Sequence, residues 1–174
     1  RGIIVNSGNA NACTGTQGDT DTAAMAHVTA EAIGGLESSV LVMSTGIIGE
    51  FLPMETIENG IRTVADQLAD NEESVLRAAR GFMTTDTRPK LTGVTFGKTP
   101  EGGTYQMLGM AKGAAMIGPK LATMLGLIIT DAAITPDDAQ RLLHQAADLT
   151  FNCVSVDGHM STNDTVLLLA NGAA

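Results

Sequence analysis

The first half of the chain alternates short apolar runs with longer segments whose apolar residues recur at helical spacing. The runs predict strands at 3–5 and 39–43. The longer segments predict helices at 19–33, at 53–69 and from Asn71 to about Gly81. The residues that support these limits are Asp19–Asp21 and Asn71 as N-caps, Pro53 in a first turn and Gly34–Gly35 as a stop.

The second half begins with a different rhythm. Two runs, 92–96 and 104–108, flank the turn KTPEGG and predict a β-hairpin. The stretch 124–130 is apolar at nearly every position, which predicts a strand covered on both faces. The remaining predicted elements are a helix at 136–150 capped by Thr135, a strand at 153–156 and a strand or helix at 165–170.

Helices and strands are mixed without strict alternation, so we expect an α/β or α+β layered domain. A chain of 174 residues is long enough for one domain with a core, or for a large piece of a bigger fold. The chain opens in a strand pattern without an initiating methionine and stops just after an apolar run. We therefore expect residues 1–174 to be a single, internal piece of a longer protein.

Composition excludes several classes of function. The net charge of −9 argues against nucleic acid or an anionic membrane surface as a partner, and an acidic surface commonly serves solubility. No apolar run reaches the ~18 residues that a membrane span needs, and no signal peptide is evident. Cys13, Cys153 and the scattered histidines lack metal-ligand spacing, so we expect no metal and a reducing, cytoplasmic location.

The stretch KLATMLGLIIT places Thr123 directly after the small residue Ala122, at the start of an apolar run. A threonine hydroxyl is a weak nucleophile and needs a base. Cleavage of the preceding peptide bond would supply one, because the new α-amine has an ordinary pKa of ~7.7–8.0. The alternative is that Thr123 is only the first residue of a buried strand.

Four other stretches carry candidate chemistry, each with a simpler alternative. The N–H groups of Thr45 and Gly46 could bind an oxyanion, or form an ordinary turn. Lys112, among small and apolar neighbours, could neutralise a substrate carboxylate or be solvated at the surface. The polar stretch TTDTRPK could line a site for a small amino acid or simply end a helix. The loop NSGNANACTG would bind phosphate only with a helix N-terminus directly after it and a cation nearby.

Five blocks occur in order along nearly the whole chain: SGNANACTG, STGIIGE, MTTDT, MAKGAAMIGPKLATML and DGHMSTNDT. Together they resemble the ornithine acetyltransferase family, the glutamate N-acetyltransferases of the arginine pathway. The resemblance implies an αββα sandwich that is similar to, but distinct from, the Ntn hydrolases. It also implies a precursor that cleaves itself between Ala122 and Thr123, so that 1–122 would end one subunit and 123–174 would begin the other.

The resemblance further implies the chemistry. Thr123 would carry an acetyl group from N-acetylornithine to glutamate by a ping-pong route, and acetyl-CoA is a second donor in bifunctional members. Thr45 and Gly46 match the oxyanion hole, and Lys112 matches a substrate-binding lysine. Thr84, with Thr85 as the next choice, matches another substrate contact. No tightly held cofactor is implied, and the family tends to form heterotetramers of two cleaved protomers.

Some positions depart from the family pattern. Ala114–Ala115 and Lys120 replace the usual Ser-Gly and Asn, and a substrate-binding glutamate that the family carries further downstream has no counterpart here. Two alternatives therefore stay open. One is an acyltransferase of the same fold with another acceptor, and the other is an inactive, small-molecule-binding relative whose chain stays intact.

Overall fold

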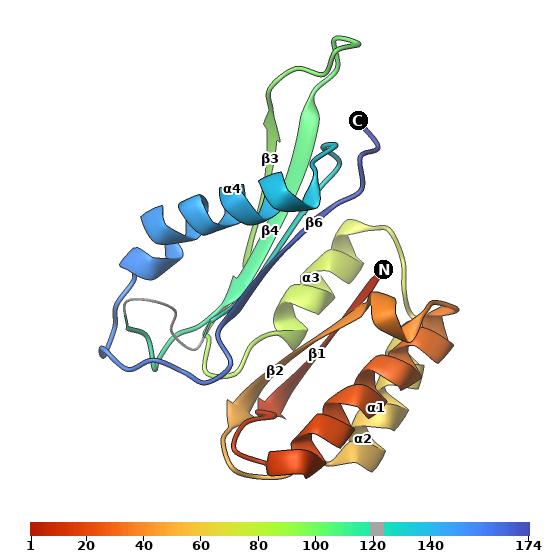
Figure 1. The fold of residues 1–174 in the computed structure, drawn as a ribbon, viewed down its shortest axis with the longest axis vertical. Helices are drawn as coiled ribbons and strands as arrows, with labels where there is room; N and C mark the ends of the chain where they lie inside the picture. The colour runs from red at the N-terminus through yellow and green to blue at the C-terminus, as the bar shows by residue number, and fades with distance from the viewer. Residues whose placement is uncertain (119–123) are drawn as a thin grey trace. The chain divides into compact units, whose positions relative to one another are not determined.

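The computed structural model describes residues 1–118 and 124–174. They form two compact units, Arg1–Thr84 and Thr85–Ala174. Each unit combines a small sheet with helices (Figure 1), so the mixed α+β class expected from the sequence is confirmed. The border after Thr84 reflects how the residues pack. It does not correspond to the predicted cleavage between Ala122 and Thr123.

In the first unit, strands β1 (Gly2–Asn9) and β2 (Val40–Ile47) pair in parallel. Helix α1 (Gly15–Ile33) and the 3-10 turn η1 (Glu37–Ser39) connect them, which makes a βαβ unit. Both strands are longer than their apolar runs, because polar residues continue the ladder as far as the pair Asn9 and Ile47. The carboxyl ends of the two strands consequently lie at the same edge.

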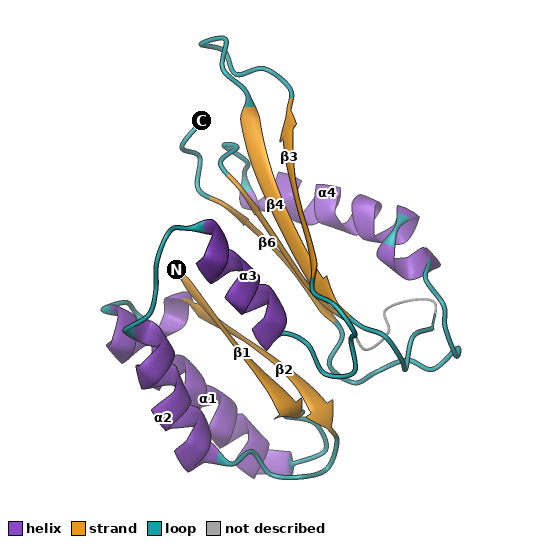
Figure 2. Ribbon diagram, turned by 180° about the vertical axis from the view of Figure 1, so that it is seen from behind, coloured by secondary structure: helices purple, strands orange, loops and turns teal. Residues whose placement is uncertain are grey.

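Two further helices, α2 (Met54–Ala65) and α3 (Glu72–Gly81), complete the first unit. The two faces of its sheet are covered differently (Figures 1 and 2): α1 and α2 lie on one side and α3 on the other. The core on the first side is built from Met25, Val28, Leu52 and Ile61, against which Ile4 and Val42 pack. On the other side, the Ser7 hydroxyl donates a hydrogen bond to the Gly81 carbonyl at 2.9 Å.

The second unit is a four-stranded sheet in the order β3-β4-β5-β6. Its strands are β3 (Lys90–Phe96), β4 (Tyr105–Lys112), β5 (Leu125–Thr130) and β6 (Thr165–Ala170). The antiparallel β3–β4 pair is the expected hairpin, β5 is antiparallel to β4, and β6 is parallel to β5. The predicted coverage of both faces of β5 holds at Leu125, Leu127 and Thr130, which are buried, but not at Ile129, which is 39% exposed.

Helix α4 (Pro136–Leu149) makes the crossover from β5 to β6 and lies across the sheet (Figure 2). Its predicted cap is confirmed, because the Thr135 hydroxyl accepts the N–H of Asp138 at 3.2 Å. The same holds for α3, where the Asn71 side chain accepts the N–H of Ser74 at 2.9 Å. The predicted stop of α1 is also confirmed, since Gly34 adopts a left-handed φ of 66°.

Some predicted boundaries are wrong. Helix α1 begins at Gly15 rather than Asp19, and α2 ends at Ala65 rather than at 69. The strand expected at 153–156 is absent from the described residues, and Phe151–Cys153 forms a 3-10 turn, η2, instead. The reason is that the N–H of Cys153 bonds three residues back, to the Thr150 carbonyl at 2.9 Å.

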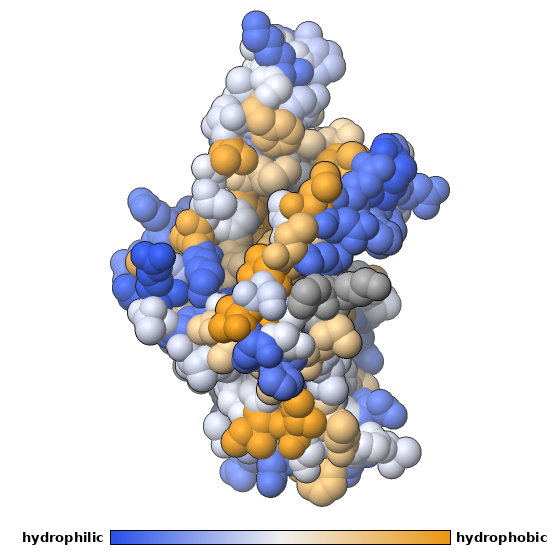
Figure 3. Space-filling model, turned by 90° about the vertical axis from the view of Figure 1, so that its left-hand side faces the viewer, coloured by the Kyte–Doolittle hydropathy of each residue, from blue (hydrophilic) through white to orange (hydrophobic). Residues whose placement is uncertain are grey.

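The surface mixes hydrophilic and hydrophobic side chains. Figure 3 shows hydrophobic atoms gathered in groups between hydrophilic ones on one face, while the tip of the β3–β4 hairpin at the top is mostly hydrophilic. Several large apolar residues are well exposed, with Leu36, Phe51 and Leu149 between 65% and 79%. Among the described residues, no helix is both long and apolar enough to cross a membrane.

Candidate functional site

The expected oxyanion pair lies near the carboxyl end of β2. Thr45 is buried and is paired with Ser7, and Gly46 is paired with Gly8. The strand continues through both residues to Ile47, so they are not a turn that closes it. In the described chain β2 has one strand neighbour, β1, and the other edge of β2 therefore presents backbone groups without a strand partner.

Gly46 is required at its position for two reasons. Its φ of 136° lies in the region that favours glycine. A Cβ atom there would also come within 2.2 Å of the carbonyl carbon and oxygen of Gly8. The neighbouring Ser44 hydroxyl joins β2 to the end of β1, because it donates to the Asn9 carbonyl and accepts the N–H of Asn11, both at 3.0 Å.

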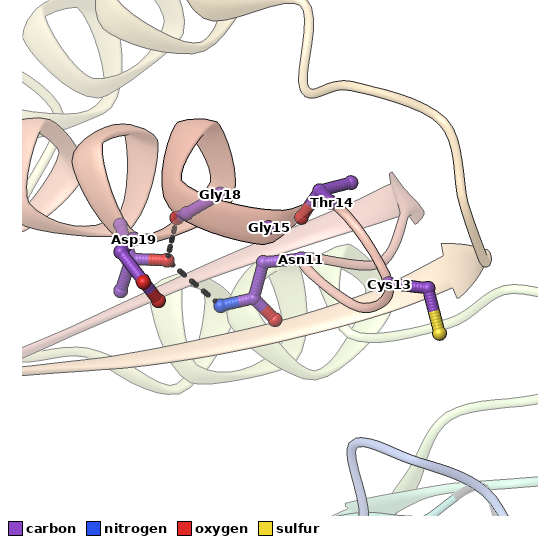
Figure 4. A pocket seen from close by; sticks show the side chains of 7 residues that line it. Asn11, Cys13, Thr14, Gly15, Gly18 and Asp19 are labelled. Atoms are coloured by element: carbon purple, nitrogen blue, oxygen red, sulfur yellow. Dashed lines mark hydrogen bonds between the residues drawn. The ribbon is translucent and has the colours of Figure 1, made fainter.

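An open pocket of about 440 Å³ lies beside the start of α1 (Figure 4). It is lined by Asn11, Cys13, Thr14, Gly15, Gly18, Asp19 and Thr22. The Asn11 amide donates to the Thr22 hydroxyl at 2.9 Å, and that hydroxyl donates to the Gly18 carbonyl at 2.8 Å. The side chain of Cys13 points away from Asn11 and Asp19.

The structure meets one of the two conditions for a phosphate loop here. Helix α1 does start directly after the GNANACTG loop. The second condition is not met, because the lining contains no cation and includes the Asp19 carboxylate. A carboxylate repels phosphate, so the loop is better described as a structural wall.

Thr84 is the last residue of the first unit and is exposed, and Thr85, the second choice, is exposed as well. Helix α3 has already ended at Gly81, so the TTDT stretch does not cap that helix. The structure thus places Thr45 and Gly46 together on β2, Thr84 at the end of the same unit, and Lys112 in the second unit.

Lys112 is the last residue of β4 and is only 1% exposed. The alternative of a solvated surface lysine is therefore wrong. Lys112 is paired with Leu125, the first residue of β5, which is paired in turn with Thr165, the first residue of β6. One end of the sheet consequently gathers the end of β4 and the starts of β5 and β6.

Three other charged groups gather at this end of the sheet. The Asp86 side chain is fully buried, forms an ion pair with Lys90 and accepts the N–H of Gly113 at 2.8 Å. Asp164 precedes β6 and accepts the N–H of Met124 at 2.7 Å. Both carboxylates interact electrostatically with the Lys112 ammonium. Burying a charge costs free energy unless the charge is paired, and the two carboxylates supply the opposite charge for the Lys112 ammonium.

The environment shifts the titration of two of these groups. Burial lowers the pKa of Lys112 from the ordinary lysine value, while the charges of Asp86 and Asp164 oppose that shift. Burial raises the pKa of Asp164, and the N–H groups of Met124 and Ser161 oppose it, as does Lys112. The two carboxylates thus favour the charged form of the Lys112 ammonium inside the second unit, against the effect of burial.

The sequence predicts a role for Lys112, but no motif in it joins Asp86 and Asp164 to that lysine. Asp86 lies in the TTDT stretch and Asp164 in the NDT stretch, far from Lys112 along the chain. They are brought together by the register of the four strands β3 to β6, and no spacing rule in the sequence provides that register. Ala122 and Thr123, the predicted cleavage site and nucleophile, lie outside the described residues.

The described residues contain no group of three or more His, Cys, Asp or Glu that could hold a metal ion. Cys13 and Cys153 are both exposed and carry free thiols. Nothing in the cluster around Lys112 has the soft or imidazole ligands that zinc prefers.

Comparison with known proteins gives a consistent result. A model of the ArgJ family matches residues 1–174. The chain is 50% identical over 172 residues to the mitochondrial arginine biosynthesis bifunctional protein ArgJ of Meyerozyma guilliermondii, covering 99% of this chain and 39% of that protein. It is 49% identical over 174 residues to the arginine biosynthesis bifunctional protein ArgJ of Geobacter sulfurreducens, covering 100% of this chain and 43% of that protein.

Two solved structures are similar. One is the arginine biosynthesis bifunctional protein ArgJ of Bacillus halodurans, with 44% identity and a TM-score of 0.62 over 68% of this chain and 60% of that one. The other is an ornithine acetyltransferase complexed with ornithine from Mycobacterium tuberculosis, with 36% identity and a TM-score of 0.61 over 68% and 61%. The chain thus spans well under half the length of the curated relatives it matches.

Proposed function

The chain belongs to the ArgJ family, and from that premise we propose that it is part of a self-processing acetyltransferase of arginine biosynthesis. The proposed reaction moves an acetyl group from N-acetylornithine to glutamate. The observation that carries the proposal is the similarity to ArgJ proteins along the whole chain. The name of one structural relative, an ornithine acetyltransferase complexed with ornithine, supports an amino-acid substrate.

The first proposed step is self-cleavage. The Thr123 hydroxyl oxygen attacks the Ala122 carbonyl carbon, the C–N bond between the two residues breaks, and the hydroxyl proton passes to the departing nitrogen. Water then hydrolyses the resulting ester, which leaves a carboxylate on Ala122 and restores the Thr123 hydroxyl. The new α-amine of Thr123 becomes the general base that the hydroxyl needs.

The second step is acetyl transfer. The Thr123 oxygen attacks the acetyl carbonyl of N-acetylornithine, the amide C–N bond breaks, and ornithine leaves with the proton on its amine. The amine of glutamate then attacks the acetyl-threonine ester, takes the acetyl group and returns a proton to the threonine oxygen. Acetyl-CoA as a second donor to glutamate is kept as part of the proposal.

Other residues have supporting roles in this proposal. Thr45 and Gly46 would stabilise the negative oxygen of each tetrahedral intermediate, and the close approach at Gly46 supports a backbone role there. Lys112 would pair with a substrate carboxylate, as the position that it matches in the family implies. Asp86 and Asp164, which interact with the same ammonium, would compete with that carboxylate. Thr84, or Thr85, would contact substrate from an exposed position.

The remaining parts of the proposal concern the whole protein. We propose a heterotetramer of two cleaved protomers, small-molecule substrates without nucleic acid or membrane partners, and no tightly bound cofactor. We propose the cytoplasm as the location; several fungal relatives carry the word mitochondrial in their names. Sedimentation of the purified protein and its absorption spectrum would test the assembly and the cofactor.

The experiment that tests the function is the intact mass of the freshly purified full-length protein under denaturing conditions. We expect two pieces, the second beginning at Thr123. A Thr123→Ala variant should stay whole, and Thr123→Ser, which keeps a hydroxyl, should still split. Acetyl transfer from N-acetylornithine to glutamate is then measured on the cleaved protein.

The outcomes separate the alternatives. A wild type that stays whole would remove the catalytic role of Thr123 and favour an inactive, small-molecule-binding relative. A wild type that splits but does not acetylate glutamate would instead favour an acyltransferase with a different acceptor.

A further inference from the structure

Two aspartates of one loop hold the backbone at two places that are close together in sequence. The loop runs from 154 to 164, between η2 and β6. Asp157 contacts Met116 and Ile117, and Asp164 contacts Met124. These contacts stand on either side of residues 119–123 along the chain.

The upstream anchor is made by both backbone and side chain. The Asp157 carboxylate accepts the N–H of Met116 through one oxygen and the N–H of Ile117 through the other, both at 2.8 Å. In return, the Ile117 carbonyl accepts three N–H groups, from Val156, Asp157 and Gly158, at 2.8–3.1 Å. This is a dense set of hydrogen bonds around a single dipeptide.

The fit of the backbone supports the same anchor. A Cβ atom on Gly118 would come within 2.7 Å of the Gly158 carbonyl carbon. Gly158 itself has a φ of 74°, which favours glycine. The backbone at Gly118 therefore lies so close to the loop that any side chain there would require the backbone to move.

The downstream anchor is made by Asp164. Its carboxylate accepts the N–H of Met124 at 2.7 Å and the N–H of Ser161 at 3.2 Å, one on each oxygen. The Met124 carbonyl accepts the N–H of Thr165 at 3.0 Å. Both backbone groups of Met124 are thus held by consecutive residues of the loop and β6.

Hydrogen bonds from N–H groups to an ionised carboxylate are stronger than those between neutral groups. The N–H of His159, followed by that of Met116, holds the pKa of Asp157 below its ordinary value, so this side chain is ionised at neutral pH. Asp164 also interacts electrostatically with the Lys112 ammonium, so the downstream anchor is part of the charged cluster around that lysine. Each aspartate therefore holds backbone N–H groups in place.

We propose that Asp157 and Asp164 are positioning residues for the reactions of Thr123. Asp157 anchors the chain just before the segment with the predicted cleavage site, and Asp164 anchors the residue directly after Thr123. This inference rests on the proposed function. The two anchors differ after cleavage. Met116 and Ile117 would then belong to one product and both aspartates to the other, whereas Asp164 and Met124 would stay in the same product.

The two anchors are therefore expected to affect self-cleavage and acetyl transfer differently. Loss of either anchor should slow self-cleavage, since the chain on one side of residues 119–123 is then held less firmly. Asp164 still holds Met124 after cleavage, so its loss should also lower the kcat of acetyl transfer. Loss of Asp157 should affect kcat much less, because its anchor lies on the other product.

The test follows cleavage in the full-length protein by denaturing mass spectrometry, at a temperature well below every thermal midpoint. Asp157→Asn and Asp164→Asn keep the size of the side chain, but an amide can accept only one of the two N–H groups. We expect cleavage roughly ten- to a hundred-fold slower for each, the effect of losing one hydrogen bond to a charged group. The matched control Asp137→Asn, an exposed residue of the first turn of α4, should cleave like the wild type.

Gly118→Ala provides a second variant that does not touch either carboxylate. Its added methyl group meets the Gly158 backbone, so it should disturb the upstream anchor and slow cleavage as Asp157→Asn does. Thermal midpoints are measured in the Thr123→Ala background, where all variants stay whole. A purely structural role would lower these midpoints and leave the cleavage rate of the folded protein unchanged.

Each outcome decides the proposal. If the wild type splits and the Asp157, Asp164 and Gly118 variants split at the rate of Asp137→Asn, the positioning roles are wrong and the proposed function stands. If the wild type itself stays whole, the proposed function fails and this inference fails with it. Slower cleavage in all three, with lower kcat only for Asp164→Asn, supports it.

Discussion

At the scale of single residues, two glycines of the first unit show how context decides the effect of the same change. Gly46 lies in a strand with a φ of 136°, and a Cβ would meet the Gly8 backbone at 2.2 Å. Gly60 lies inside helix α2, where a Cβ would have no neighbour within 4 Å. Both are glycine, yet only the first is required by the backbone.

Gly46→Ala should destabilise the protein by about 2–4 kcal/mol, because strain and a backbone clash act together. Gly60→Ala should stabilise it by about 0.5–1 kcal/mol through helix propensity and a less flexible unfolded chain. Urea unfolding of the Thr123→Ala protein with each change measures both. Equal effects of the two substitutions would contradict the close approach at Gly46.

Lys112 gives a pH-dependent prediction. Burial lowers its folded-state pKa below the ordinary 10.5 of the unfolded chain. Between the two values the unfolded chain binds more protons than the folded one, so stability from this group rises with pH. The stability of the Thr123→Ala protein relative to the same protein with Lys112→Met should therefore increase as the pH rises toward 10.5 and level off above that value.

Unfolding of both proteins across this pH range measures the difference, with Lys98→Met on the β3–β4 hairpin turn as the control. A difference that stays constant with pH would mean that the lysine is not desolvated in the folded state.

At the scale of elements, the sequence was most informative where a side chain acts on its own backbone. The caps at Asn71 and Thr135 were predicted and are present. The start of α1 was misplaced because its polar residues are satisfied inside the helix. Thr20 bonds back to the Thr16 carbonyl, and Asp21 accepts from the Gln17 side chain, so neither is a cap.

Longer-range contacts could not be read from the sequence. The N–H groups of Val156, Asp157 and Gly158 go to the Ile117 carbonyl, which removes them from any strand. The cluster around Lys112 likewise depends on which strands become neighbours. Local hydrogen bonds leave a pattern in nearby residues, whereas these contacts join segments far apart in sequence.

A pair of threonines tests the role of the cap of α4. Thr135→Ala should cost about 0.5–2 kcal/mol, because the N–H of Asp138 then loses its acceptor. Thr20→Ala, on the exposed face of α1, should change stability by less than about 0.5 kcal/mol. Thermal unfolding of the two variants compares them directly, and a cost at Thr20 that matched the cost at Thr135 would contradict a specific cap.

At the scale of the whole molecule, β4 and β5 stand on opposite sides of the proposed cut and pair along six positions, from Met107 with Thr130 to Lys112 with Leu125. The proposed cleavage would break one covalent bond and leave this ladder in place. We therefore expect the two pieces to run as one particle in native gel filtration and to separate only in denaturant. Separation under native conditions would contradict the role of the ladder.

The β4–β5 ladder also decides how the protein recovers from unfolding. Before cleavage, the strands are joined by a short connection, and pairing is a first-order event. After cleavage the same pairing needs two molecules to meet, so refolding becomes second-order and slows with dilution. A Thr123→Ala protein should refold at a rate independent of concentration, while the cleaved protein should not. Self-cleavage would thus make unfolding practically irreversible at low concentration, because the two separated pieces would rarely meet again.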